Sequence, residues 1–263
     1  MNIQDRINRY WSMRAVEFGD ETMEERGLPA YEAWQTEIIR RLPEQETVRA
    51  LDLGCGPGFA AMILREAGCE VTGIDYAEKM AAVAAETARK CGIDGIEFLC
   101  MDAQDMAFAD ETFDFIFTRN VTWTLPDPAA AYREMVRVLK PGGRIMNCDA
   151  RYNRVFRRTD AEGTTMNAAS DKNKDRYEHP SDSPEMLRER NDFAKNLPAA
   201  DYDRPYWDAA YLQELGMTVK ELDESFGPRV IQKRPVTAEG NHDADMFMIL
   251  AEKPAAGPDG GTV

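Results

Sequence analysis

Residues 48–59 have the sequence VRALDLGCGPGF, an apolar run that leads directly into a turn with three glycines. The run predicts a buried strand, and the residues from Phe59 onward predict a helix. Glycines in the turn let the backbone approach a ligand closely, and the N–H groups at the start of the helix favour a carboxylate or a phosphate. This stretch therefore predicts a strand, a turn and a helix that together bind a small molecule.

The alternation of strand and helix patterns continues after this unit, which favours βαβ units and a parallel sheet. Residues 139–143, with the sequence LKPGG, predict a turn, because proline and two glycines do not continue a helix. The expected strands lie at residues 48–53, 70–75, 96–100, 113–118 and 144–149, and the expected helices between them lie at 58–67, 77–91 and 128–138.

Helical segments flank this core. The pattern predicts two N-terminal helices, a last helix before two final strands, and an inserted cap at residues 151–204, which far exceeds the usual loop of about 4–6 residues. Within the cap, Ser183, Pro184 and Glu185 predict the start of a helix. The N-terminal helices are expected at residues 3–18 and 28–42, the last helix at 205–215, and the final strands at 217–222 and 245–252.

Composition narrows the location and the partners that we expect. No apolar run approaches the length of about 20 residues that a membrane span needs, and the first residues lack the pattern of a secretory signal, so we expect a cytoplasmic protein without a membrane partner. A formal net charge of −15 would repel a phosphate backbone, so no nucleic-acid partner is expected. The five cysteines form no C-x-x-C pair, and we expect no metal site.

Three aspartates follow successive predicted strands. Asp52, Asp75 and Asp102 stand at or next to the ends of the first, second and third strands. The carboxyl ends of parallel strands converge on the crevice where such sheets bind ligands, so the three acids are expected around one pocket. At the second strand, Asp75 has two interpretations: it accepts hydrogen bonds from both hydroxyls of a ribose, or it caps the helix that opens at Ala77.

The spacing of the glycine turn selects the ligand. An acidic residue followed by G-x-G-x-G, rather than the G-x-G-x-x-G of dinucleotide binders, resembles the first motif of the class I S-adenosylmethionine (SAM)-dependent methyltransferase family. The resemblance extends over about residues 5–150. It implies an α/β fold with a Rossmann-like, seven-stranded, mostly parallel sheet flanked by helices, an N-terminal helical lid and a helical cap inserted after strand five.

The resemblance also implies a reaction. SAM is the implied cofactor, its methyl group is transferred to a small-molecule acceptor, and S-adenosylhomocysteine (SAH) is released. The reacting acceptor atom stays open among oxygen, nitrogen, sulfur and carbon. Residues 1–254 are expected to form a single domain, with N-terminal helices at 1–45, the SAM-binding core at 46–150, the cap at 151–204, the last helix and strands at 205–254, and a disordered tail at 255–263.

By the same resemblance, Gly54 and Gly56 approach the methionine part of SAM, and Asp52 helps to fix that end. Asp75 binds the ribose, Asp102 accepts from the adenine amino group, and the backbone at Asn120 meets the methionyl amine. The short helix around Tyr10 and Trp11 resembles a lid from which Arg14 meets the cofactor carboxylate. The remaining expected cofactor contacts are Tyr10, Cys55, Gly58, Tyr76, Met80, Ala103 and Val121.

The acceptor side is less defined in the sequence. Trp11 and Trp123 are the expected substrate contacts, although a tryptophan near a strand end also suits the core. No residue stands in a motif that assigns a general base, and Asp149, Tyr152 and His179 are the candidates. Positioning and desolvation supply much of the rate in such a transfer.

Two other functions share parts of this pattern. A SAM-binding protein or SAM-using enzyme that does not methylate would keep the same cofactor motifs, because fold does not fix function. An NAD-dependent oxidoreductase would share the glycine turn and the acid of the second strand, but it gives no role to Asp102. The oligomeric state is open, with a homodimer as one option.

Overall fold

A seven-stranded sheet forms the centre of the structure, a computed structural model that describes residues 2–150, 183–230 and 246–255. The order of the strands across the sheet is β3-β2-β1-β4-β5-β7-β6. Their bounds are β1 (Arg49–Leu53), β2 (Glu70–Asp75), β3 (Ile96–Cys100), β4 (Phe113–Arg119), β5 (Leu139–Ala150), β6 (Thr218–Asp223) and β7 (Met246–Glu252).

The sheet is mostly parallel, as the sequence predicted. Strands β1 to β5 pair in parallel, whereas β7 runs antiparallel to both β5 and β6. The chain builds outward from β1 to β3 and then returns to place β4 on the other side of β1. The strand order therefore reverses between β1 and β4, and sheets of this kind bind ligands at the carboxyl ends of the strands where that reversal occurs.

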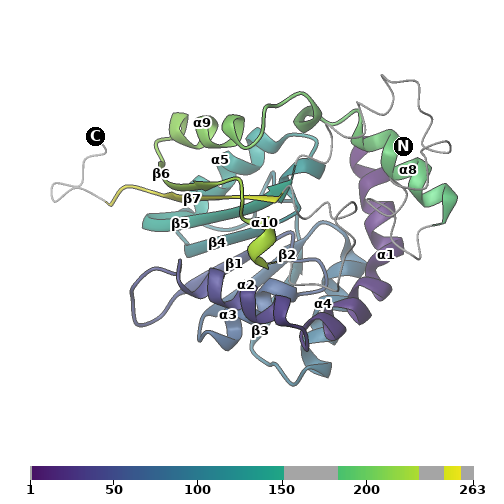
Figure 1. Cartoon of the computed structure of the whole chain (residues 1–263), viewed down its shortest axis with the longest axis horizontal. Coiled ribbons are helices and arrows are strands. Elements are labelled where there is room, and N and C mark those ends of the chain that lie inside the picture. Colours follow the sequence, from purple (N-terminus) through teal and green to yellow (C-terminus); the bar gives the residue numbers. More distant parts are fainter. Residues whose placement is uncertain (1, 151–182, 231–245, 256–263) are drawn as a thin grey trace.

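Helices cover both faces of the sheet (Figure 1). On one face, α2 (Pro29–Ile39), α3 (Phe59–Glu66) and α10 (Gly227–Val230) pack on a core that includes side chains of β4, β5 and β7. On the other face, α5 (Pro128–Val138) and α9 (Tyr206–Glu214) cover a second core. Because both faces are covered, the central strands are mostly apolar, and every residue of Phe113–Thr118 is buried.

Three further helices shape the region beyond the carboxyl ends of the strands. The helix α4 (Glu78–Lys90) packs on β2 and β3, and α1 (Ile3–Glu25) packs against α4 and against α8 (Pro184–Ala194). Figure 1 shows α1 and α8 side by side at one end of the sheet. The expected start of a helix at Ser183 is confirmed, because its hydroxyl accepts a hydrogen bond from the backbone N–H of Met186.

Two boundaries differ most from the sequence prediction. The first helix continues to Glu25 instead of ending near residue 18, because small residues such as Ala15 and Gly19 keep one side buried against α4. The turn predicted at 139–143 lies inside β5. Phe113 of β4 pairs with Leu139 and Phe115 pairs with Arg144, so β5 advances five residues where β4 advances two and forms a bulge. The Gly142 N–H donates to the Lys253 carbonyl at 2.8 Å, which keeps this bulged segment in the sheet.

Part of the predicted cap can be compared with the structure. Of residues 151–204, those from 183 onward form α8 and a short 3₁₀ helix at Pro198–Ala200. Residues 151–182, with the candidate bases Tyr152 and His179, lie outside the described residues, as do residues 256–263 of the predicted tail.

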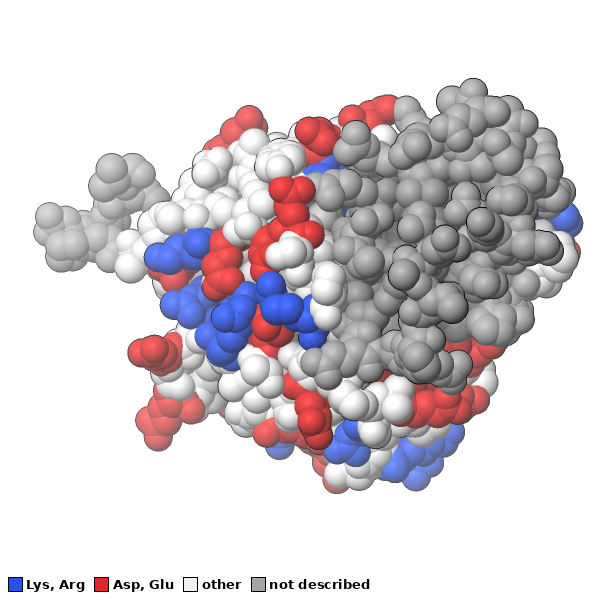
Figure 2. Space-filling view, in the orientation of Figure 1, with Lys and Arg blue, Asp and Glu red and all other residues white. Residues whose placement is uncertain are grey.

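Charged side chains of both signs are interspersed on the face in Figure 2, including the area around α10 and the neighbouring strands. Arg41, Arg144 and Arg229 each pair with carboxylates of other elements: Arg41 with Glu221 at 2.6 Å, Arg144 with Glu252 at 2.9 Å, and Arg229 with Asp223. These arginines therefore have acidic partners within the molecule.

Within the described ranges, no helix is both long and apolar enough to cross a membrane. The same residues contain no cluster of three or more His, Cys, Asp or Glu side chains that could hold a metal ion.

Candidate functional site

A cavity of about 410 Å³ lies where β1, β2 and β4 end, with α1 along one side. Its volume falls within the range of about 300–1,000 Å³ that is usual for cofactor sites. All but one of the expected cofactor and substrate residues line it. They are Tyr10, Trp11, Arg14, Asp52, Gly54, Cys55, Gly56, Asp75, Tyr76, Met80, Asp102, Ala103, Asn120, Val121 and Trp123.

The glycine turn opens one wall of the cavity. Gly56 has φ +51°, and a Cβ atom added there would meet no other atom within 4 Å. Gly54 has a different constraint, because an added Cβ would lie 2.3 Å from the Val121 side chain. The first glycine thus permits the close approach of β1 to the segment after β4, and the second leaves the cavity open at a backbone conformation that suits glycine.

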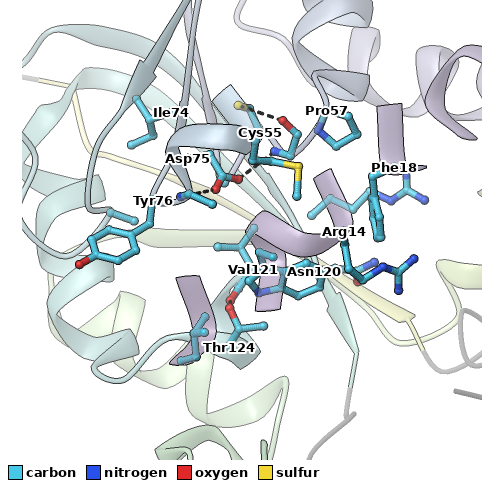
Figure 3. Close-up of a pocket in the computed structure, with 18 of the residues that line it drawn as sticks. Arg14, Phe18, Cys55, Pro57, Ile74, Asp75, Tyr76, Asn120, Val121 and Thr124 are labelled. Carbon is cyan, nitrogen blue, oxygen red and sulfur yellow. Dashed lines mark hydrogen bonds between the residues drawn. The ribbon is translucent and has the colours of Figure 1, made fainter. Parts of the chain in front are cut away.

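Asp75, at the end of β2, holds the turn in place (Figure 3). One carboxylate oxygen accepts from the Gly56 N–H at 3.1 Å, and the other accepts from the Ala77 N–H at 2.9 Å. The helix α4 starts at Glu78 without a side-chain cap, so Asp75 does not cap that helix. Each oxygen keeps a further lone pair for a hydroxyl donor. Burial raises the pKa of Asp75 to about 6, despite these two hydrogen bonds.

Asp52 joins the first strand to the helix that follows the turn. It is buried, and it accepts a hydrogen bond from the Ala61 N–H in the first turn of α3 at 2.8 Å. The N-cap residue of that helix is Gly58, which has no side chain for this purpose, so Asp52 supplies the missing acceptor. Burial raises the pKa of Asp52 to about 7, and the nearby Asp75 also raises it.

Gly58 is the expected contact that does not line the cavity. It has φ +91° and a Cβ added to it would meet Phe98 at 3.2 Å, so it faces the protein interior behind the turn. Gly58 is the N-cap residue of α3, in a left-handed conformation that suits glycine.

Asp102, just after β3, is bonded to the N-terminal helix. Its carboxylate accepts from the Gln4 side chain at 3.1 Å and from the Gln104 N–H at 2.9 Å. Gln4 belongs to α1, so this contact joins the helix to the edge of the cavity. The sequence contains no signal for Gln4, because an isolated glutamine on a helix resembles any solvated polar residue.

Asn120 follows β4 in the left-handed conformation, with φ +58°. Asparagine tolerates this conformation better than most residues. Its N–H donates to the Cys148 carbonyl at 2.9 Å, and its carbonyl accepts from the Trp123 indole at 3.0 Å. Its side-chain oxygen Oδ1 is buried and has no hydrogen-bond partner among the described residues. A buried acceptor on the wall of a cavity suits a ligand donor.

Asp149 lies outside the cavity wall and does not suit the role of base. Its side chain is fully buried and accepts from the Thr122 hydroxyl at 2.6 Å and the Trp123 N–H at 2.9 Å. It also pairs with the buried Arg204 at 3.1 Å. These bonds hold the short 3₁₀ helix Thr122–Thr124 beside the cavity, and the candidate base Asp149 is not among the described residues that line the cavity.

Aromatic side chains of α1 form the far side of the cavity, and Phe193 of α8 packs against one of them. Tyr10 packs edge-on against Trp11 and against Phe193 of α8, with ring centroids 5.0 and 5.6 Å apart. The guanidinium carbon of Arg14 lies 4.4 Å from the centroid of the Phe18 ring, and Figure 3 shows the two side chains together. The lid predicted from the tyrosine and tryptophan pattern therefore adjoins the cavity.

Sequence reasoning missed several cavity residues. Gln4, Phe18 and Glu25 of α1, Arg119 of β4 and Arg190 of α8 all contribute to the wall. Of these residues, Arg119 could have been found most easily from the sequence, because it directly precedes the expected cofactor contact Asn120. Arg190 comes from the predicted cap, and no local pattern directs it toward the sheet.

The chain is similar to known methyltransferases over its core. Residues 51–147 match the family model described as Methyltransferase domain. Demethylmenaquinone methyltransferase of Bacillus cytotoxicus is 32% identical over 119 residues, which are 44% of this chain and 50% of that protein. The enzyme of the same name from Clavibacter sepedonicus is 34% identical over 44% of this chain and 46% of its own length. The chain thus spans about half the length of the curated relatives it matches.

Solved structures share the fold over most of the chain. A SAM-dependent methyltransferase from Aquifex aeolicus has a TM-score of 0.53 at 18% identity, over 88% of this chain and 97% of that one. One from Mesorhizobium loti has a TM-score of 0.57 at 21% identity, over 84% and 98%. The [4+2]-cyclase SpnF has a TM-score of 0.51 at 20% identity, over 85% and 81%.

At these identities the solved structures establish the fold alone, and a named cyclase among them shows that the fold is not confined to one reaction. The matched domain and the half-length relatives add a likeness to methyltransferases over the core of the chain. In its strand order, its glycine turn and its matched core, the chain is similar to the class I SAM-dependent methyltransferases.

Proposed function

We propose that this protein transfers the methyl group of SAM to a small-molecule acceptor and releases SAH. The observation that carries the proposal is the placement of Asp52, Asp75 and Asp102 around one cavity, at the ends of β1, β2 and β3. Three carboxylates around the cavity match a ligand that has hydrogen-bond donors along its length. SAM has such donors in its adenine amino group, its ribose hydroxyls and its methionyl ammonium.

The residues of the cavity divide among the parts of the cofactor. We assign Asp75 to the ribose, because both of its oxygens are fixed by backbone donors and keep lone pairs for hydroxyls. Asp102 is assigned to the adenine amino group, beside Gln4 of α1. The open space at Gly56 is assigned to the methionine part, where an added side chain would intrude.

SAM supplies an electrophilic methyl group on a sulfonium. The task of the protein is to orient the acceptor in line with that group and to exclude water. Trp123 is 5% exposed and is fixed by its bonds to Asn120 and Asp149, so its ring forms a rigid part of the wall. No histidine is found among the described residues of the wall, and we assign no general base.

Apolar and aromatic residues on the side of α1 favour an apolar or aromatic acceptor. Ile7, Trp11 and Trp123 line this side, and Leu125 and Pro126 continue it. Demethylmenaquinone, for which the matched relatives are named, has this chemical character. We propose that the acceptor is a small molecule of this class. We also propose that residues 1–254 form a single domain that binds it.

The test has two stages. Calorimetric titrations with SAH and NADH come first, and we expect SAH to bind and NADH not to bind. In the second stage, the protein is incubated with SAM and fractionated metabolite extracts, and the products are analysed by mass spectrometry. The expected result is SAH together with a product that has gained one methyl group. Turnover of SAM without such a product would contradict methyl transfer, and binding of NADH without SAH would contradict the cofactor.

A further inference from the structure

Arg190 of α8 places a guanidinium on the wall of the cavity. The residue is 8% exposed, so its charge is largely removed from water. Its Nε and Nη2 each donate to the side-chain oxygen of Asn191 at 3.3 Å. Burying a charge is unfavourable unless an anion or several acceptors lie beside it. An arginine buried on the wall of a cavity therefore suits an anionic ligand.

The position of Arg190 on α8 is one that the helix otherwise fills with apolar side chains. Met186, Phe193 and Ala194 belong to the cluster between α8 and α1 or pack against it. They lie three or four residues from Arg190, and residues at that spacing share one face of a helix. The charge thus stands on the apolar face of α8, where packing alone favours an apolar residue.

The acidic residues of α8 are engaged elsewhere. Glu189 pairs with Arg6 of α1 at 2.7 Å, and Asp192 pairs with the same arginine at 2.8 Å. Neither acid is among the described residues that line the cavity. Arg190 is therefore the charge that the described part of α8 presents to the cavity.

Arg190 belongs to the aromatic side of the cavity, opposite the strand ends that bear the aspartates. Ile7, Tyr10 and Trp123 line this side and belong to the same cluster as the apolar face of α8. The Trp123 indole donates to the Asn120 carbonyl at 3.0 Å, and the backbone at Asn120 is expected to meet the methionine part of SAM. The aromatic side thus adjoins the part of the cofactor that bears the methyl group.

We propose that Arg190 binds a carboxylate group of the methyl acceptor, whose apolar or aromatic body packs on Ile7, Trp11 and Trp123. This inference rests on the proposed function, and it narrows the acceptor to an apolar or aromatic acid. The planar fork of a guanidinium matches the two oxygens of a carboxylate. Its five N–H donors allow it to bind a ligand while it keeps bonds within the protein. Arg190 then selects the acceptor, and its role does not fix which atom receives the methyl group.

The first experiment compares a carboxylate with its neutral counterpart. The chain is saturated with SAH, and 2-naphthoate or 2-naphthamide is titrated into it by calorimetry. The two probes share one ring system and differ in charge. We expect the wild type to bind 2-naphthoate more tightly than 2-naphthamide. Arg190→Met should weaken 2-naphthoate binding by about tenfold to hundredfold, the range for a lost charge-assisted hydrogen bond, and should leave 2-naphthamide binding unchanged.

Two further variants separate the guanidinium from the helix that bears it. Arg190→Lys keeps the charge without the fork, so its affinity for 2-naphthoate should lie between those of the wild type and Arg190→Met. Arg188→Met is the matched control, because Arg188 is exposed on the same helix and does not line the cavity. It should change neither affinity. SAH affinity is measured for every variant, and the unchanged value that we expect shows that the variant is folded.

The second experiment does not depend on a chosen probe. A metabolite extract is passed over an anion-exchange resin at neutral pH, and the bound and unbound fractions are each incubated with the protein and SAM. We expect the methylated product to arise from the bound fraction. Arg190→Met should raise the apparent KM for that fraction with little change in kcat, because it removes binding that the ground state and the transition state share.

Each outcome decides the matter. Weaker SAH binding in Arg190→Met would assign Arg190 to the cofactor and overturn the proposal. A wild type that binds 2-naphthoate no more tightly than 2-naphthamide would also overturn it, as would a methylated product from the unbound fraction alone. Loss of 2-naphthoate affinity with SAH binding retained is the supporting result. A wild type that does not bind SAH, or that methylates nothing in either fraction, would overturn the proposed function itself.

Discussion

At the level of single residues, two buried carboxylates determine how the turn of the cavity is built. Asp75 accepts from the N–H groups of Gly56 and Ala77, and Asp52 accepts from the N–H of Ala61. Asp52 satisfies a backbone donor in the first turn of α3, whereas Asp75 satisfies donors of the glycine turn and of the residue before α4. The same burial that makes these bonds strong makes ionisation costly, which explains the raised pKa of both groups.

The stability of the ligand-free protein should depend on the ionisation of Asp52. Its folded-state pKa is about 7 and its ordinary value is 3.8, so the folded state binds more protons between these values. Stability from this group is therefore full below about pH 4 and is lost as the pH rises through about 7. Between pH 4 and pH 8 we expect the wild type to lose on the order of 3 kcal/mol in the free energy of unfolding through this group, and we expect Asp52→Asn not to show this loss.

Urea unfolding of the wild type and Asp52→Asn at both pH values measures this difference. Asp110→Asn, at an exposed acid, is the control and should follow the wild type. An identical pH dependence in wild type and Asp52→Asn would contradict the expected ionisation.

Two single substitutions should weaken SAH binding. Asp75→Ala removes the carboxylate assigned to the ribose, and we expect a loss of about tenfold to hundredfold. Gly56→Val places a side chain in the open space of the cavity and should weaken binding at least as much. Gly68→Val is the matched control, because Gly68 also has positive φ and open space but does not line the cavity.

Calorimetry with SAH gives the affinities, and circular dichroism shows whether each variant is folded. Folded Asp75→Ala and Gly56→Val proteins with unchanged affinity would mean that the cofactor binds elsewhere.

At the level of elements, α1 is joined to its surroundings by contacts at its N-terminal end. Gln4 bonds to Asp102, and Arg6 pairs with Glu189 at 2.7 Å and with Asp192 at 2.8 Å. The two acids belong to α8, so the first helix and the cap helix are joined by one arginine. Pairs this exposed contribute little to global stability, but they restrict local opening of the helices.

Arg6→Gln should therefore increase local opening without unfolding the sheet. In hydrogen–deuterium exchange, we expect faster exchange in the first turns of α1 and in α8, with unchanged exchange in β1 and β4. Arg89→Gln is the control, because the partner of Arg89 among the described residues is Glu86 of the same helix, at 2.7 Å. Uniformly faster exchange throughout the chain would show that Arg6 stabilises the whole fold instead.

At the level of the whole molecule, a buried ionic network joins the end of β5 to α9 and to the segment after β4. Arg204 is 2% exposed and pairs with Asp149 at 3.1 Å and with Asp208 at 2.7 Å. It also donates to the Thr122 hydroxyl at 2.6 Å, and Asp208 accepts from the Tyr132 hydroxyl at 2.7 Å. One guanidinium thus pairs with two buried carboxylates and holds the segment after β4 in place beside the cavity.

Removing this guanidinium should be costly. Arg204→Met leaves Asp149 and Asp208 buried without their counter-ion, and we expect a loss of about 3–5 kcal/mol in the free energy of unfolding. Urea denaturation measures this loss. The triple variant Arg204→Met, Asp149→Asn and Asp208→Asn removes the uncompensated charges and should recover part of the stability. A loss below about 1 kcal/mol for Arg204→Met would show that water or rearrangement replaces the ion pairs.

Much of the fold and some of the site could be predicted, because their signals are local. The glycine turn after β1 and the strands that end at Asp52 and Asp75 follow from neighbouring residues and from apolar periodicity. The bulge in β5 could not be predicted, because it depends on the pairing of Gly142 and Gly143 with Lys253 at the far end of the chain.

The sequence by itself determined which strands end at an aspartate, where the glycine turn lies and which class of cofactor is expected, since each depends on residues that are close in the chain. Only the tertiary structure decided which side chains complete the cavity. Gln4 bonds to a residue 98 positions away, and Arg119 lies between rings from two different helices. The tertiary structure also shows that the candidate base Asp149 is bound by a buried arginine. The sequence gives no sign of this contact, because Arg204 is 55 positions away. Such contacts depend on how distant segments pack, and a local pattern contains no record of that packing.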